Sequence, residues 1–148
     1  AHIRFAQEKL LGKMYWKGKE RFWTFNGTKR ELWEQTKSLL RSPVKRRIWI
    51  KDKKPKTLAG LSALSQLTML NPPSLPVYAI GWDEWKKSRW QEVPSSEDAT
   101  YELEIWSYDP LLFANKNIID PFSLYLRLDG SSDERVEIAL EELMSKIW

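Results

Sequence analysis

The sequence predicts an α+β fold, in which a small mixed β-sheet packs with about four helices behind an N-terminal helix and β-hairpin. Apolar residues recur at helical spacing in several segments, which predicts amphipathic helices. Short runs rich in β-branched and aromatic residues lie between these segments, which predicts strands. Glycine and proline separate the two kinds of segment and supply the turns.

The N-terminal segment predicts a helix that leads directly into a hairpin. Gly12 is a stop signal near the end of a helical face with the spacing i, i+3, i+7 and i+11, formed by Ile3, Ala6, Leu10 and Met14. Two strand-forming runs follow at 14–16 and 21–25. The turn between them contains Gly18, so the pair of runs predicts a β-hairpin.

The middle of the chain predicts two helices and three strands. Thr28 and Glu31 fit a capping box, which predicts a helix up to about residue 40. A second helix, rich in small residues, is expected over 58–70, and a polar loop over 92–99. Strands are expected at Arg46–Lys51, Pro76–Ile80 and Tyr101–Trp106. The last strand should be half-exposed because its apolar and polar residues alternate.

Two further helices are expected near the C-terminus. Asp120 followed by Pro121 is typical of an N-cap with proline at the first helical position. Ser131 and Glu134 fit a second capping box. The helix after them has one apolar face, formed by Val136, Ala139, Leu140, Leu143, Met144 and Ile147.

The composition excludes several classes of site. The chain has no cysteine, its one histidine is His2, and it contains six glycines, none of them in a phosphate-binding motif. Thiolate metal sites, histidine-dependent catalytic sets and nucleotide-binding loops are therefore not expected. No apolar run approaches the ~18 residues of a membrane span. We expect no catalytic residue, no metal, no cofactor and no membrane, and a cytoplasmic protein.

The charges are divided along the chain. Residues 1–56 contain 17 Lys/Arg against 5 Asp/Glu, a net charge of +12, whereas residues 57–148 contain 7 against 15, a net charge of −8. The basic part begins with the predicted helix and hairpin, an order typical of the end of a winged helix-turn-helix. Candidate phosphate contacts there are Arg4, Lys9, Lys13, Lys17, Lys19 and Arg21. The alternative is a solvated basic surface that binds no nucleic acid.

The segment from Arg41 to Lys56 carries eight more cations against Asp52. Three interpretations stay open. The segment follows a phosphate backbone, with Lys45, Arg46 and Arg47 as nucleic-acid contacts. It forms a strand edge on which cations prevent aggregation. Its cations pair with the acidic half of the same chain.

Two other patterns are weaker. Tryptophans alternate with cations over 82–90, which suits stacking on single-stranded bases, but Trp82, Trp85 and Arg89 share a helical face and favour packing. Glu84-Trp85-Lys86 matches half of a PD-(D/E)xK nuclease site, which also needs an aspartate on a neighbouring strand. Glu102 and Glu104 could be paired carboxylates, although strand alternation explains them more simply.

Several stretches together resemble a known family. In order, they are KLLGKMYWKGKERFWTF, ELWEQTKSLLRSPVKRRIWI, LAGLSALSQLTMLNPPSLPVYAI, EIWSYDPLLF, DPFSLYLRL and DERVEIALEELMSKIW. They resemble bacterial MarR-type transcriptional regulators similar to the AbiEi class of antitoxin-repressors. The resemblance implies the end of a winged helix-turn-helix over 1–27 and a C-terminal domain over 28–148.

We therefore expect the C-terminal part of a DNA-binding regulator that has no chemistry of its own and mediates protein interaction or dimerisation. DNA would be contacted by the basic N-terminal half together with residues upstream of Ala1, since the chain starts inside a predicted helix. A protein partner or a second copy of the chain would meet the remainder. The alternatives are a Mg²⁺-dependent nuclease-like domain and a protein-binding module without a nucleic-acid role.

Overall fold

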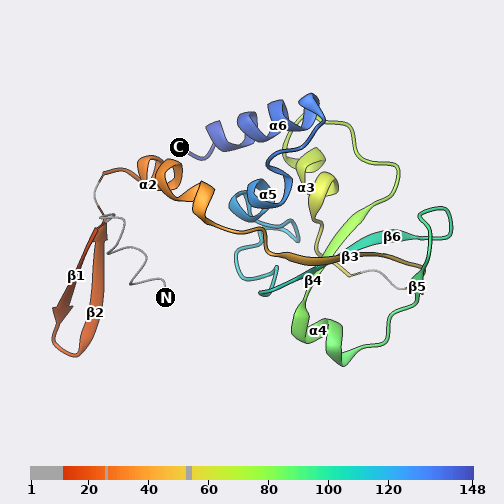
Figure 1. Cartoon of the computed structure of the whole chain (residues 1–148), viewed down its shortest axis with the longest axis horizontal. Coiled ribbons are helices and arrows are strands. Elements are labelled where there is room, and N and C mark those ends of the chain that lie inside the picture. The colour runs from red at the N-terminus through yellow and green to blue at the C-terminus, as the bar shows by residue number, and fades with distance from the viewer. Residues whose placement is uncertain (1–11, 26, 53–54) are drawn as a thin grey trace. The chain divides into compact units, whose positions relative to one another are not determined.

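The computed structural model describes residues 12–25, 27–52 and 55–148. It divides the chain into two compact units, the first comprising residues up to 40 together with Trp148 and the second comprising residues 41–147. The α+β class predicted from the sequence is confirmed (Figure 1). The predicted domain boundary at residue 27 stays a prediction.

The first unit contains an antiparallel hairpin. β1 (Gly12–Lys17) pairs with β2 (Glu20–Phe25) over its full length, from Gly12 opposite Phe25 to Lys17 opposite Glu20. A two-residue turn joins them, and Gly18 adopts a φ of 64° there, a conformation that favours glycine. The hairpin is as expected. The helix predicted before it lies outside the described residues, apart from Met14, which lies in β1.

A short helix follows the hairpin. α2 (Lys29–Thr36) continues into the 3-10 turn η1 (Lys37–Leu39). The predicted capping box is confirmed: the Glu31 N–H donates to the Thr28 hydroxyl at 3.2 Å, and the Thr28 N–H donates to the Glu31 carboxylate at 3.2 Å. Both bonds satisfy N–H groups that a helix start leaves without a partner, so the helix begins where the sequence predicts.

The second unit is built on a four-stranded mixed sheet. Its strands are β3 (Val44–Ile50), β4 (Val77–Gly81), β5 (Glu92–Val93) and β6 (Tyr101–Trp106). Their order is β4-β6-β3-β5, with β4 parallel to β6 and the other pairs antiparallel. Three strands match the prediction. The segment 92–99 is expected to be a polar loop. Its first two residues form β5 instead, because they pair with Trp49 and Ile50 at the end of β3.

Four helices complete this unit: α3 (Gly60–Leu67), α4 (Trp82–Lys87), α5 (Pro121–Leu128) and α6 (Glu134–Ser145). α3 is shorter than the predicted 58–70 because the Ala59 N–H donates to the Val77 carbonyl, which places the chain before Gly60 beside β4. α6 begins after Asp133, whose carboxylate accepts from the Arg135 N–H at 3.0 Å. The predicted cap at Ser131 is therefore wrong, whereas the predicted N-cap at Asp120 is confirmed.

Both faces of the sheet are covered. On one face, α3, α5 and α6 enclose a core that includes Leu64, Trp106, Leu124 and Leu140. On the other face, Ile50, Leu103 and Ile105 pack with the tryptophans of α4. Figure 1 shows α4 on the opposite side of the sheet from α3, α5 and α6. β6 lies between β4 and β3 and is buried along most of its length, so the half-exposed strand expected from its alternation is wrong. None of the helices in the described residues is long and apolar enough to cross a membrane.

Candidate functional site

The first group of candidate residues lies on the hairpin. Lys13, Lys17, Lys19 and Arg21 are all exposed on β1, β2 or the turn between them. Among the described residues, none of the four forms an ion pair with a carboxylate, and Glu20 is the one acid within the hairpin. Arg4 and Lys9, the other candidates in this part of the chain, lie outside the described residues.

The hairpin carries aromatic side chains among these cations. Because side chains alternate along a strand, Lys13, Tyr15 and Lys17 share one face. Tyr15 stacks on Phe22 across the hairpin, with ring centroids 5.6 Å apart. On the other face the Arg21 guanidinium lies over the Trp16 ring at 6.0 Å, and Trp16 is 62% exposed. The hairpin thus presents cations and flat apolar rings to solvent on both faces.

The second group of candidates lies on β3, and each of its cations has a partner. The Lys45 ammonium lies 4.8 Å from the centre of the Trp82 ring. Arg46 lies over Trp85 at 5.7 Å and forms a long ion pair with Glu92, at 3.8 Å between Nη2 and Oε1. Contacts between cations and aromatic faces hold these side chains against α4.

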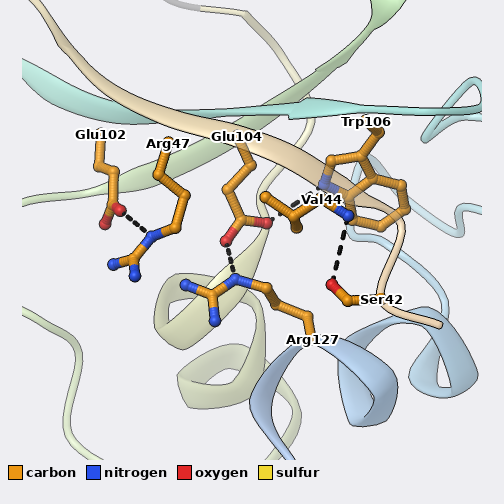
Figure 2. Close-up of polar contacts among 7 residues, drawn as sticks. All are labelled: Ser42, Val44, Arg47, Glu102, Glu104, Trp106 and Arg127. Atoms are coloured by element: carbon orange, nitrogen blue, oxygen red, sulfur yellow. Dashed lines mark hydrogen bonds and ion pairs between the residues drawn. The ribbon is translucent and has the colours of Figure 1, made fainter.

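Arg47 points to the opposite face of the sheet from Arg46. Its Nε donates to Glu102 Oε1 at 2.5 Å, and the Arg47 side chain is 54% exposed while the Glu102 side chain is 16% exposed. Figure 2 shows Arg47 and Glu102 on the same side of the sheet as Glu104 and Trp106. At the start of β3 the Val44 N–H donates to the Ser42 hydroxyl, next to a register shift between Val44 and Arg46.

Glu104 lies at the centre of this cluster and is fully buried. Its carboxylate accepts from Arg127 Nε at 2.7 Å and from Trp106 Nε1 at 3.2 Å (Figure 2). Burial raises the pKa of the Glu104 carboxyl, and the Arg127 charge and the two hydrogen bonds oppose this effect. Arg127 comes from α5, so the ion pair joins that helix to the central strand.

The surroundings of Glu104 allow no side chain at Gly60. Gly60 has a φ of 49°, and a Cβ there would lie 3.0 Å from Val77 Cγ1 and 3.2 Å from Glu104 Oε2. The start of α3 therefore approaches the buried carboxylate closely because residue 60 is glycine. The buried carboxylate and its donor on α5 hold that helix to the central strand of the sheet.

Sequence reasoning missed the Glu104–Arg127 pair. It placed Glu102 and Glu104 on one strand face, which is correct, but treated both as half-exposed. The signal that could have revealed the pair is Arg127 itself, the one charged residue among the mostly apolar residues 122–128. A cation in such a pattern needs an acidic partner if the helix is packed on a core.

A cavity of about 390 Å³ adjoins the cluster. Arg47, Glu102, Glu104 and Arg127 contribute to its polar lining. Apolar side chains complete the walls, among them Trp49, Leu61, Val77, Leu128 and Val136. Within these four residues the negative charges of the two glutamates equal the positive charges of the two arginines, and Asp133 also lines the cavity.

The nuclease hypothesis stays a prediction; Asp52 and Glu84 both line one pocket of the second unit. Glu84 and Lys86 lie on the six-residue helix α4, and Lys86 lies 3.7 Å from the carboxylate of Asp83. Asp52 is the aspartate that precedes the motif in the chain, and its carboxylate accepts hydrogen bonds from the Gln91 N–H and the Tyr101 hydroxyl. Within the described ranges, no three His, Cys, Asp or Glu side chains come close enough together to hold a metal ion.

The tryptophans of 82–90 pack on the sheet. Trp82, Trp85 and Trp90 lie against the core residues of β3, β4 and β6, and Trp85 stacks on Trp90 at 6.1 Å. This is the packing interpretation of the segment.

No protein-family model, curated protein or solved structure matches this chain significantly. The resemblance to MarR-type and AbiEi-like regulators therefore stays a prediction from the sequence stretches quoted above.

Proposed function

We propose that this chain is part of a DNA-binding transcriptional regulator of the antitoxin-repressor type, in which the β1–β2 hairpin binds DNA phosphates. In this proposal the second unit has no catalytic role and mediates a protein interaction or dimerisation. A cytoplasmic location belongs to the same proposal, since a regulator acts where the DNA is.

The observation that carries the proposal is the set of exposed hairpin cations without acidic partners among the described residues. An exposed lysine or arginine that makes no ion pair keeps its full charge available to a phosphate, and releasing counterions from DNA then favours binding. The tip carries Lys17 and Lys19 on either side of Gly18, and no bulky side chain at Gly18 shields them. This is the arrangement expected of a wing that follows the DNA backbone.

Lys45, Arg46 and Arg47 are not part of this proposal. Each lies against an aromatic ring or a carboxylate of its own unit, whereas the hairpin cations form no ion pair among the described residues. Their contact with nucleic acid stays a prediction.

The proposal is tested with a charge-reversed tip. We expect Lys17→Glu with Lys19→Glu to weaken binding of the whole chain to a labelled DNA duplex by at least about tenfold, because two phosphate contacts become repulsive. The measurement is fluorescence anisotropy at low salt. The matched control is Lys87→Glu with Lys116→Glu, which makes the same change in net charge on exposed residues of the second unit.

Equal weakening in both double variants would show that only the total charge matters and would contradict a wing. Absence of duplex binding by the unaltered chain at low salt would also contradict the proposal.

A further inference from the structure

One edge of the sheet is open. The outer edge of β4 is covered, because Ala59 donates to the Val77 carbonyl and Ala79 donates to the Thr57 carbonyl, both at 3.0 Å. At the other edge β5 pairs with Trp49 and Ile50 alone. The first five residues of β3, Val44–Ile48, thus have β6 on one side and no strand of the described chain on the other.

The backbone of this edge points the polar groups of Arg47 outward, next to the register shift between Val44 and Arg46. Lys51 donates to the Gln91 carbonyl on the β5 side. Since backbone groups that face the same neighbour recur every second residue, the N–H and C=O of Arg47 face the open edge. Such groups are a template for a further strand.

The side chains of the edge make it selective. Arg46 lies on the face of α4 and Arg47 lies on the face of α3 and α5, so an added strand would meet a guanidinium on each of its faces. Each arginine is about half exposed, and the bond from Arg47 to Glu102 uses Nε, which leaves the two Nη groups for a second carboxylate. Next to Arg47, Trp49 is 38% exposed and offers an apolar contact.

The same cations reject a second copy of the chain at this edge. Antiparallel pairing of β3 with β3 of another molecule would place Lys45, Arg46 and Arg47 opposite cations, and like charges directly opposite each other destabilise a pair of strands. An acidic strand meets no such repulsion. Pairing centred on Arg46 is therefore unfavourable for a second copy and favourable for a segment of opposite charge.

We propose that the open edge of β3 binds a short, extended, acidic segment of a partner protein as an additional strand. Five residues of strand span about 16 Å, so the bound segment has about four or five residues. The backbone hydrogen bonds of the added strand supply affinity, and its carboxylates on the two arginines supply specificity. This proposal gives a chemical class to the protein partner in the proposed function and rests on that part of it.

The test uses the whole chain and a labelled peptide in which glutamates alternate with threonines and valines. We expect saturable binding in fluorescence anisotropy. A peptide of the same sequence with N-methylated amides on the pairing side should bind at least about tenfold more weakly, because it cannot form the strand-to-strand hydrogen bonds. A peptide with lysines in place of the glutamates should not bind.

Variants then locate the site. Arg46→Gln with Arg47→Gln should weaken binding of the acidic peptide at least about tenfold, whereas Arg135→Gln, an exposed cation on α6, should leave it unchanged. The N-methylated peptide decides the question with the unaltered chain, so the test does not depend on the folding of the double variant.

Three results would overturn the proposal. The first is equal binding of the normal and the N-methylated peptide, and the second is no binding of either. The third is displacement of the peptide by DNA together with loss of DNA binding in the β3 variant, which would make the edge a phosphate contact. Failure of the hairpin proposal is distinguishable, because the Lys17 and Lys19 variants change DNA binding and not peptide binding.

Discussion

Two groups of cations close together in the sequence have different surroundings in the structure. Those of the hairpin, such as Lys17 and Lys19, lie on a two-stranded sheet and have no acidic partner in the described residues. Those of β3 lie in a four-stranded sheet, where Arg46 and Arg47 contact Glu92 and Glu102. The comparison teaches that cations close together in a sequence differ in whether folding gives them acidic partners, and the hairpin cations without such partners are the candidate phosphate contacts.

The division of charge along the chain consequently has a different meaning in three dimensions. Residues 1–40 contain 9 Lys/Arg against 4 Asp/Glu, whereas residues 41–147, the second unit, contain 15 against 16. The basic stretch after residue 41 thus belongs to a unit whose charges nearly cancel, and two of its cations, Arg46 and Arg47, pair with acids of β5 and β6. The unbalanced positive charge belongs to the first unit.

The largest effect expected from this comparison concerns a cation that is structurally essential. Arg127→Ala should lower the free energy of unfolding by about 3–5 kcal/mol, because it leaves the buried Glu104 carboxylate without its charged partner. Lys17→Ala, which removes an exposed hairpin cation, should change stability by about 0.5 kcal/mol or less. Urea denaturation followed by tryptophan fluorescence measures both, and equal losses would contradict the contrast.

A smaller effect concerns pH. Burial raises the pKa of Glu104 above its unfolded value, so the native state binds a proton more readily than the unfolded chain does. The contribution of this group to stability is complete below the unfolded pKa and is lost as pH rises through the folded pKa. Glu104→Gln cannot titrate, so the unaltered chain should become less stable relative to this variant as pH rises from about 4.5.

Thermal melts of the two proteins across this pH range measure the difference. A difference that is constant with pH, or one that shifts in favour of the unaltered chain as pH rises, would show that Arg127 outweighs burial in setting the pKa.

Features that depend on neighbouring residues could be predicted from the sequence. The hairpin, the capping box at Thr28 and the apolar face of α6 each arise from residues a few positions apart. Their local pattern therefore contains most of the physical information, and the structure confirms all three.

Features that depend on distant residues could not be predicted in this way. β6 alternates like a half-exposed strand, but its place between β3 and β4 brings apolar residues onto both faces. Glu104 and Arg127 are 23 positions apart, and only the packing of α5 on the sheet brings them together. The partners of Arg46 and Arg47 come from strands about 45 to 55 positions later, so the sequence left their role open.

The salt dependence of DNA binding tests the distinction between the two groups most directly. Affinity for a duplex falls linearly on a double logarithmic plot against salt, and each phosphate contact that is removed reduces the steepness by about one. Lys17→Ala with Lys19→Ala should reduce the slope by about two, whereas Lys45→Ala with Arg46→Ala should leave it unchanged. A reduced slope in the β3 variant with an unchanged slope in the hairpin variant would contradict the account.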